Sequence, residues 1–373
     1  MLTGSGFLVL FLWLGLLFGR GDFWRMREDD ATGPPGPARW PAVTAVVPAR
    51  DEADVIAESL GSLLDQDYPG PFHIILVDDG STDGTGDIAR ALAAARFSGR
   101  LRVLQGAPLP SGWTGKLWAL SQGIAAAGDT PKYLLLTDAD IVHDPDSVRS
   151  LVARAEAGNL AMASLMAKLH CESLAERATI PAFIYFFQML YPFRLVNGPG
   201  RKAAAAGGCL LANRTALERA GGIASVKGAL IDDCAMGARL KMQGPIWLGL
   251  TERVRSIRRY ETMQPVAQMV TRSAYAQLRY SPLILAGTLA GMVVTFLAPP
   301  ILEIGFGDPA ALLAWILMTV SFVPVTRRYG VSPSWSLALP LIALLYSLWT
   351  VRSALAHWRG RGGYWKGRVQ AAR

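Results

Sequence analysis

Hydrophobic residues occur in two patterns, as long uncharged runs near both ends of the chain and as short runs in its middle. The first uncharged run ends at Gly19 and is rich in Phe, Leu, Val and Trp. Three more lie near the C-terminus, at residues 281–302, 309–326 and 329–351. Each run approaches the ~20 residues that a membrane-spanning helix needs. We therefore predict a membrane anchor at residues 1–20 and transmembrane helices within residues 281–351.

The positions of the basic residues bear on how these runs cross the membrane. Arg20 and Arg25 follow the first run, whereas a signal peptide carries its positive charge before the apolar stretch. This favours a retained anchor whose C-terminal side faces the cytosol. Arg327, Arg328 and the basic tail at residues 352–373 also favour the cytosol, yet three full crossings cannot place them all there. Either one run is re-entrant or interfacial, or the tail departs from the rule.

Residues 43–250 show the alternation of short strands and helices that is typical of an α/β domain. Strands are predicted at residues 43–47, 73–77, 101–104 and 133–136, and helices at residues 53–65 and 85–95. This spacing implies βαβ units and a mainly parallel sheet, in which ligands bind beyond the carboxyl ends of the strands. The Pro- and Gly-rich residues 21–42 are expected to be a linker, and residues 251–280 a basic juxtamembrane segment.

Composition supports membrane attachment and excludes several other classes of protein. The chain has 373 residues, of which 51% are hydrophobic and only 18% charged, against about 25% charged in globular proteins. The net charge of +8 would suit nucleic acid or an anionic membrane surface. Basic residues cluster beside the uncharged runs and no nucleic-acid motif is present, so we expect a membrane partner and no nucleic acid. Cys171, Cys209 and Cys234 are too few for a disulfide framework or a zinc cage, so reduced thiols are expected.

Acidic residues gather where three of the predicted strands end. Glu52 follows the first strand, Asp79 the second, and Asp138 and Asp140 the fourth. One such loop is readily explained as a turn that caps a helix. Three acidic loops at one sheet edge instead indicate a cation or donor groups that offset the repulsion between carboxylates. Asp138 and Asp140 flank one small residue, which suits a hard divalent cation, Mg²⁺ or Mn²⁺, that completes its shell with water and phosphate oxygens.

These strand-end motifs resemble those of a known enzyme family. The strings VVPARDE at residues 46–52, VDDGSTDGT at residues 77–85 and TDAD at residues 137–140 look like the family 2 inverting nucleotide-sugar glycosyltransferases, which have the GT-A fold. The resemblance implies a GT-A catalytic domain at residues 43–250 that binds a nucleotide sugar, with UDP as the expected nucleotide. It assigns the nucleobase to Asp79, ribose and metal to Asp138, and metal to Asp140. It also places the following residues in the donor pocket: Pro48, Ala49, Arg50 and Glu52.

Three later segments extend the resemblance. The pair Asp232 and Asp233 resembles the acidic pair that opens a helix in this family, which implies Asp233 as general base beside Asp232. An inverting transfer needs one carboxylate to take the proton of the acceptor hydroxyl, although an acidic pair also stabilises a helix N-terminus without any catalytic role. Lys116 in GWTGKLWA resembles the lipid-modifying branch and could meet a phosphate or a carboxylate of the site. Gly208 resembles a glycine step where the backbone passes close to sugar.

The whole chain looks similar to a narrower group, the bacterial hopene-associated glycosyltransferases. The strings that carry this likeness include QMLYPF at residues 188–193 and YWKGR at residues 364–368. The resemblance implies a hopanoid or other lipid acceptor, transfer of a single sugar, and a multi-pass protein of the bacterial cytoplasmic membrane whose catalytic domain faces the cytosol. The aromatic residues 180–196 are either a buried helix or an interfacial helix, and we favour a role in acceptor entry.

Two other functions remain open from the sequence. A processive polysaccharide synthase usually carries a Gln-x-x-Arg-Trp motif, and the string at residues 277–280 is shorter and lacks the Trp. Arg272 or Arg279 could still reach the diphosphate. A non-catalytic membrane sensor of nucleotide sugars is the second alternative, although a degenerate site would be free to lose its carboxylates. The basic run at residues 253–260 is interpreted mainly as attraction to anionic headgroups.

Overall fold

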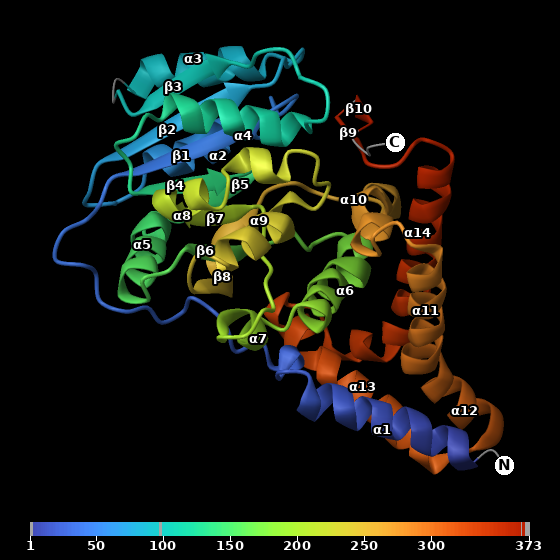
Figure 1. Ribbon diagram of the computed structural model, residues 1–373. Helices are drawn as coiled ribbons and strands as arrows, with labels where there is room; N and C mark the ends of the chain where they lie inside the picture. The colour runs from blue at the N-terminus through green and yellow to red at the C-terminus, as the bar shows by residue number, and fades with distance from the viewer. Residues whose placement is uncertain (1–2, 97–98, 367, 370–373) are drawn as a thin grey trace.

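A computed structural model describes residues 3–96, 99–366 and 368–369, and an eight-stranded sheet forms the centre of its α/β domain (Figure 1). The strands are β1 (Val43–Ala49), β2 (Phe72–Asp78), β3 (Leu101–Gln105), β4 (Tyr133–Thr137), β5 (Ile141–His143), β6 (Met162–Lys168), β7 (Cys209–Asn213) and β8 (Ile246–Ser256). Their order across the sheet is β3-β2-β1-β4-β7-β6-β8-β5. The predicted α/β class and the four predicted strands are confirmed.

The first half of the sheet is parallel and the second half is mixed. β1 pairs in parallel with β2 and β4, and β2 with β3, so their carboxyl ends share one edge. β7 then runs antiparallel to both β4 and β6, and β5 runs antiparallel to β8. The antiparallel β7 brings the chain back to the same edge, so that the residues just before Cys209 lie beside the end of β4.

Alternating side chains of the strands divide the core into two layers. Val43, Ala45 and Val47 of β1 pack into a buried cluster on one face of the sheet, whereas Val46 belongs to the cluster on the other face. Both faces are apolar because helices cover both of them, which is why the strands read as continuous hydrophobic runs. The second cluster continues into the apolar helices, where Trp13, Met318 and Phe322 are fully buried.

Helices surround the sheet and connect it to an apolar bundle. Those of the α/β domain are α2 (Ile56–Leu64), α3 (Thr85–Arg96), α4 (Gly115–Ala126), α5 (Ser147–Ala157), α8 (Arg214–Arg219) and α9 (Asp232–Lys241). Those between the domain and the bundle are α6 (Leu174–Leu190), α7 (Phe193–Asn197) and α10 (Met263–Gln277). The bundle contains α1 (Thr3–Gly19), α11 (Pro282–Met292), α12 (Ala298–Phe306), α13 (Pro309–Arg328) and α14 (Leu339–Trp358).

Three apolar helical segments among the described residues are long enough to cross a membrane. They are Pro282–Phe306, Pro309–Arg328 and Pro333–Trp358, and the N-terminal apolar helix is shorter than these. A short π-helix, Val293–Leu297, joins α11 to α12, and the indole of Trp13 donates a 2.8 Å hydrogen bond to the carbonyl of Thr295 within it. Figure 1 shows α1 running alongside α13 and α11 alongside α14, so the N-terminal helix belongs to the same bundle.

α6 connects the α/β domain to the apolar helices. The hydroxyl of Tyr185 lies 2.6 Å from the Ser321 hydroxyl of α13, and Tyr346 of α14 donates to the Thr179 carbonyl over 2.9 Å. Residues 180–196 contain two prolines, of which Pro181 lies inside α6 and Pro192 marks a break before α7. The segment is therefore a helix that is largely buried between the two parts of the molecule.

Residues 21–42 pack against the domain, although their composition predicted a linker. Asp29 forms a bridge to Leu250 of β8, and the buried Asp30 accepts a 2.7 Å hydrogen bond from the Thr251 hydroxyl. Arg253 of β8 also pairs with Asp30. Local Pro and Gly content favours an irregular backbone, but these contacts with β8 still give the segment a defined place.

Candidate active site

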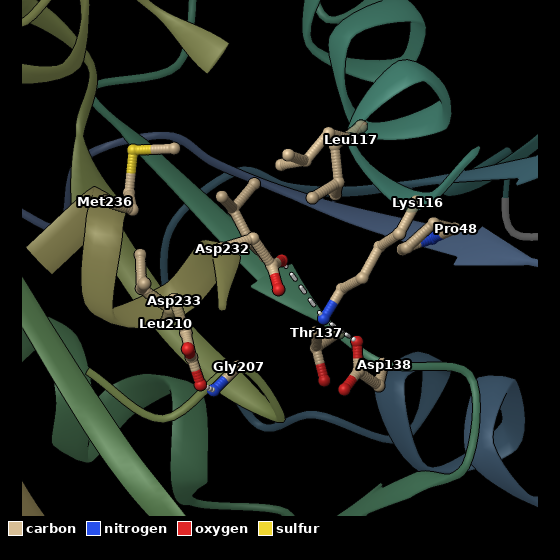
Figure 2. A pocket seen from close by; sticks show the side chains of 12 residues that line it. Pro48, Lys116, Leu117, Thr137, Asp138, Gly207, Leu210, Asp232, Asp233 and Met236 are labelled. Carbon is tan, nitrogen blue, oxygen red and sulfur yellow. Dashed lines mark hydrogen bonds and ion pairs between the residues drawn. The ribbon is translucent and has the colours of Figure 1, made fainter. Parts of the chain in front are cut away.

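The carboxyl ends of β1 and β4 meet the starts of α4 and α9 at one pocket. Pro48 of β1, Asp138 after β4, Gly207 before β7, and Asp232 and Asp233 at the start of α9 line it. Figure 2 shows the Lys116 side chain pointing from α4 into the space between Asp138 and Asp232, with Asp233 beside Gly207. Of the five residues that the sequence assigned to metal, base and phosphate or carboxylate binding, the pocket brings together Lys116, Asp138, Asp232 and Asp233, and Asp140 does not line it.

Lys116 is the central positive charge of this pocket. Its ammonium nitrogen lies 2.7 Å from Asp138 Oδ1 and 3.5 Å from Asp232 Oδ2. Burial alone would lower the pKa of Lys116, but the neighbouring carboxylates of Asp138 and Asp232 outweigh it and raise that pKa. Lys116 is the second residue of α4, which Thr114 caps by accepting from the Leu117 amide. The lysine is therefore permanently charged and fixed by the helix start.

Asp233 is a buried carboxylate in a geometry that suits a base. Its Oδ2 accepts a 2.9 Å hydrogen bond from the Gly207 amide, and its Oδ1 accepts one of 2.7 Å from the Cys234 amide. Burial and the neighbouring Asp232 carboxylate raise the pKa of Asp233, Lys116 and the two amides lower it, and the net result is a pKa of about 6. A carboxylate with a pKa just below neutrality is ionised at pH 7 and still binds a proton well, which are the two properties of a general base.

Asp140 and Glu52 form a second charged group beside the pocket. The Arg258 guanidinium donates from Nε to Asp140 over 2.8 Å and from Nη2 to Glu52 over 2.5 Å. Burial alone would lower the pKa of Arg258, and the two carboxylates raise it instead. Arg258 was not among the residues that the sequence assigned to the site. It lies two residues after β8, next to Ile257, whose amide donates to the Asp140 carbonyl over 3.0 Å.

This finding corrects the interpretation of residues 253–260 as a membrane-surface patch. Arg253 pairs with Asp30 and Asp146, Arg255 pairs with Asp144, and Arg258 pairs with two site carboxylates. The run continues β8 along the acidic edge of the sheet, so its charges meet carboxylates of the same chain. Arg272 and Arg279 are both exposed, and neither forms an ion pair with a site carboxylate in the described part of the chain.

The end of the site assigned to the nucleobase contains Asp79 and Arg50. Asp79 is only 5% exposed, and its amide donates to the Ala49 carbonyl over 2.8 Å, which joins the ends of β1 and β2. Arg50 Nη1 donates to the Asp79 carbonyl and lies 3.9 Å from its carboxylate. Asp78 and Asp83 accept backbone amides of the same loop, so these two carboxylates shape the turn, as the capping interpretation predicts.

Two consecutive glycines precede β7, and the first of them lines the pocket. A Cβ atom on Gly207 would lie 3.2 Å from the Lys116 ammonium and 3.4 Å from Asp233 Oδ2, and one on Gly208 would lie 3.2 Å from Ile141. The Gly208 carbonyl accepts a 2.8 Å hydrogen bond from the Thr137 hydroxyl, which lies 2.9 Å from His143 Nε2. Gly208 therefore holds β7 against the end of β4 and lets the backbone pass close to the pocket.

The residues present fit a divalent cation that takes most of its ligands from a substrate. Asp138 and Asp140 offer carboxylate oxygens, which hard cations prefer, but each is paired with a cationic side chain. Among the described residues, no group of three or more His, Cys, Asp or Glu side chains is arranged so that it could hold a metal ion. This donor set matches Mg²⁺ or Mn²⁺ bound by two carboxylates plus phosphate oxygens and water, rather than a cage built by protein alone.

Glu176 fixes the segment that carries Arg258. Its side chain is 1% exposed and accepts the amides of Glu172, Ser173 and Tyr260 as well as the ring nitrogen Nδ1 of His170. Burial alone would raise the pKa of Glu176, but the amides of Tyr260, Ser173 and Glu172 together lower it to about 2. The start of α6 is thereby tied to the backbone two residues after Arg258.

We expect Glu176→Ala to lower the free energy of unfolding by about 2 kcal/mol at pH 7, because four donors lose their shared charged acceptor. The folded pKa of Glu176 lies below its unfolded value, so its stabilising effect is complete above pH 4.5 and is lost as the pH falls toward 2. Thermal unfolding of the detergent-solubilised protein measures both effects. Glu172→Ala, at a side chain that is 76% exposed, is the matched control. Equal stability of the two variants would contradict the role of Glu176.

Family models identify the class of protein that this fold and pocket define. A model of glycosyl transferase family 2 matches residues 44–221, and a model of glycosyl transferase family group 2 matches residues 133–353. The second match covers more than half of the chain and includes β4, α9 and the apolar helices. The chain belongs to the family 2 glycosyltransferases.

The chain is also similar to one characterised protein in sequence and to solved structures in fold. The chain is 33% identical over 164 residues to the succinoglycan biosynthesis protein ExoO of Rhizobium meliloti (strain 1021), a match that covers 40% of this chain and 44% of that protein. The chain thus matches less than half of the length of this relative. The mannosyltransferase PcManGT from Pyrobaculum calidifontis, solved with GDP-Man and Mn²⁺, aligns with a TM-score of 0.58 and 18% identity over 97% of this chain and 100% of that one. Glucosyl-3-phosphoglycerate synthase from Mycobacterium tuberculosis aligns at a TM-score of 0.42, with 20% identity over 64% and 78% of the two chains. The alignment with the mannosyltransferase, which has the higher TM-score, confirms the GT-A fold.

Proposed function

We propose that this protein is a membrane-bound inverting glycosyltransferase that transfers one sugar from a nucleotide sugar to a lipid hydroxyl. The observation that carries the proposal is the pocket in which Asp233, a buried carboxylate with a raised pKa, faces Lys116 and Asp138. Tyr191, the C-cap residue of α6, interacts with Cys234 next to Asp233, and α6 packs against an apolar helix long enough to cross a membrane. A sugar nucleotide and a lipid hydroxyl can therefore reach the same site from water and from the bilayer.

The donor would lie along the edge of the sheet from Asp79 to Asp138. Asp79 would accept a hydrogen bond from the nucleobase, while Pro48, Ala49, Arg50 and Glu52 form the neighbouring wall. A UDP-sugar is our first expectation. A GDP-sugar is the second, because the mannosyltransferase that shares this fold was solved with GDP-Man.

Asp138 and Asp140 would hold Mg²⁺ or Mn²⁺ together with the diphosphate. Such a cation, when bound, neutralises charge on a diphosphate leaving group. Lys116 and Arg258 lie on these same carboxylates in the structure and offset their repulsion. A diphosphate bound beside Asp138 and Asp140 would therefore lie within reach of both basic side chains.

The proton transfer follows from the position of Asp233. As the acceptor oxygen bonds to the anomeric carbon, the carbon–phosphate oxygen bond on the opposite face breaks and the nucleoside diphosphate leaves. The hydroxyl proton passes to Asp233, which the Gly207 and Cys234 amides hold in place. Attack from the opposite face inverts the anomeric configuration. Asp232 contributes by pairing with Lys116 and by raising the pKa of Asp233.

The acceptor is proposed to be an isoprenoid or related lipid, with a hopanoid as the specific candidate. Support comes from the apolar bundle and from the aromatic helix α6, which contacts α13 and α14 through Tyr185 and Thr179. We further propose that the protein spans the bacterial cytoplasmic membrane several times and that its α/β domain faces the cytosol, where nucleotide sugars are made. Arg327 and Arg328 at the end of α13 are consistent with this orientation.

We expect Asp140→Asn to weaken metal-dependent nucleotide binding by about tenfold or more, because half of the charged oxygen ligands on the protein would be lost. Titration of UDP and GDP into the purified full-length protein, with Mn²⁺ and with a chelator, measures this. The surface variant Asp129→Asn, at a side chain that is fully exposed, serves as control. Identical affinities of Asp140→Asn and the unaltered protein under both conditions would contradict the assignment.

A direct test of the proposed reaction uses the purified protein in lipid nanodiscs that contain extracted bacterial lipids. UDP- and GDP-sugars labelled in the sugar are added with Mn²⁺, and the label in the organic phase is measured. Transfer of label to one lipid supports the proposal. Label that enters only a water-soluble polymer would instead identify a polysaccharide synthase, and nucleotide binding without transfer to any acceptor would favour a sensor.

A further inference from the structure

The C-terminal end of the described chain returns from α14 to the candidate donor site. Two short strands, β9 (Tyr364–Trp365) and β10 (Arg368–Val369), pair as an antiparallel hairpin. Figure 1 shows this hairpin beside the α/β domain, at the end of α14 that lies away from α12 and α13. It follows a glycine-rich stretch in which Gly360 and Gly363 have positive φ angles of 71° and 67°. Glycine adopts such angles at little cost, so the stretch can redirect the chain.

Lys366, between the two strands, makes the contacts with the donor site. Its ammonium lies 3.0 Å from Glu52 Oε1 and donates to the Asp51 carbonyl over 2.8 Å. Its own carbonyl accepts a 3.2 Å hydrogen bond from Arg50 Nε. The hairpin therefore contacts three consecutive residues of the loop that follows β1.

These three residues connect Lys366 to both ends of the donor site. Arg50 contacts the carbonyl of Asp79, the proposed nucleobase residue. Glu52 shares Arg258 with Asp140, one of the two proposed metal ligands. The hairpin thus meets the loop midway between the nucleobase end and the metal end, where a bound nucleoside diphosphate would extend.

In the described part of the hairpin, the contacts with the loop after β1 are those of Lys366, and they are polar contacts of a kind that forms and breaks readily. The Lys366 side chain is 22% exposed, and its ion pair lies at the edge of the site rather than in a core. Glu52 retains Arg258 as a partner when Lys366 leaves, so opening does not strand a buried charge. An element held by exchangeable polar contacts at the edge of a site can open locally without unfolding the domain.

We propose that the C-terminal hairpin is a lid over the bound nucleoside diphosphate and that Lys366 is the residue that holds it closed. This inference rests on the donor site proposed above. Closure places Lys366 against Glu52, adds a positive charge near the diphosphate and slows the escape of the nucleotide. Because the hairpin follows α14 in the chain, its closing over a bound nucleotide also connects α14 to the donor site.

The test compares Lys366→Met with Arg361→Met in the full-length detergent-solubilised protein. Arg361 lies in the same basic tail, is exposed, and has no side-chain partner among the described residues. Its replacement removes one positive charge, as the replacement of Lys366 does, but no contact with the donor site. We expect Lys366→Met to raise the dissociation constants of UDP and GDP, measured with Mn²⁺, by about tenfold, as loss of one charge-assisted contact would. Arg361→Met should leave them unchanged.

Limited trypsin digestion provides a second measurement on the lid itself. Cleavage after Arg361 should be slowed severalfold by UDP or GDP in the unaltered protein, and Lys366→Met should accelerate cleavage without nucleotide and remove the protection. Unchanged nucleotide affinity and unchanged cleavage in Lys366→Met would overturn the lid while leaving the donor site intact. If the unaltered protein binds neither nucleotide, the proposed function fails. Faster cleavage of Lys366→Met alone would then assign the residue a structural contact and overturn its role in donor closure.

Discussion

Replacing Asp233 with asparagine will lower the rate of sugar transfer by about 10²–10⁴-fold, the range that a general base contributes. The amide has nearly the shape of the carboxylate, and its oxygen can keep one of the two hydrogen bonds from the Gly207 and Cys234 amides, whereas its NH2 group is a donor and loses the other. It cannot accept the proton of the acceptor hydroxyl. Affinity for UDP or GDP should remain within about twofold, because the proposed contacts with the nucleotide and the metal are made by other residues. Initial rates of labelled sugar transfer, measured beside nucleotide titrations, separate the two effects.

The pH dependence of transfer provides an internal check on this assignment. Asp233 must be ionised to act, and its pKa is raised to about 6, so activity should increase with pH through about 6 and then level off. In Asp233→Asn the residual activity should lack this step. Asp129→Asn, an exposed change of the same kind, should behave like the unaltered protein. Transfer by Asp233→Asn at more than a tenth of the normal rate would contradict the role of Asp233 as base.

Replacing Lys116 with methionine will remove the positive charge that Asp138, Asp232 and Asp233 share. We expect the free energy of unfolding to fall by about 2 kcal/mol at pH 8, less than for a fully buried pair because the Asp138 side chain is 34% exposed. Lys116 also lowers the pKa of Asp233, so its loss should move the acidic limb of the pH–rate profile to higher pH. Thermal unfolding and rate profiles of the same preparation measure the two shifts.

The pH dependence of this loss in stability distinguishes an electrostatic role of Lys116 from a packing role. The folded pKa of Asp233 lies above its unfolded value, so the stability that protonation contributes is complete below about pH 4 and is lost as the pH rises through about 6. The deficit of Lys116→Met should therefore be larger at pH 8 than at pH 5. Lys116→Arg keeps the charge and should recover part of the stability. A deficit that is the same at both pH values would assign Lys116 a packing role only.

Much of the fold could be predicted from local pattern. The β-branched run of β1 and the Leu-rich run of β4 are buried on both faces, and such strands produce continuous hydrophobic runs that are visible in a single sequence. The parallel arrangement then places Asp79 and Asp138 at one edge. The pocket formed by Lys116, Asp138, Asp232 and Asp233 was anticipated through family resemblance and strand-end position.

The residues that were missed act through contacts between distant segments. Arg258 and Arg259 are neighbours of the same type, and nothing local distinguishes the one that pairs with Asp140 from the one that has no ion pair among the described residues. Lys366 reaches Glu52 across more than three hundred residues, from a basic tail for which the sequence favours only a cytosolic location. Glu176 looks like an ordinary helix-capping residue in sequence, and only the three-dimensional arrangement shows that Tyr260 donates to it.

The sequence also predicts poorly the structure of segments that contain proline or glycine. Pro181 is compatible with the interior of α6, although proline usually ends a helix, and this helix is held by Tyr346 and Ser321 of the apolar bundle. Residues 21–42 are ordered by Asp29 and Asp30 along β8. In both cases tertiary contacts outweigh the local preference, and such contacts cannot be read from composition.

The most direct test of the central claim is mass spectrometry of total lipids from bacterial cells that express the unaltered protein, Asp233→Asn, or neither. We predict one lipid class that gains the mass of a single sugar with the unaltered protein and not with the variant at equal expression. The mass gained names the sugar, and the parent lipid names the acceptor. A lipid product that accumulates equally with Asp233→Asn, or a ladder of added sugars, would contradict the assignment of a single-sugar transferase that uses this carboxylate.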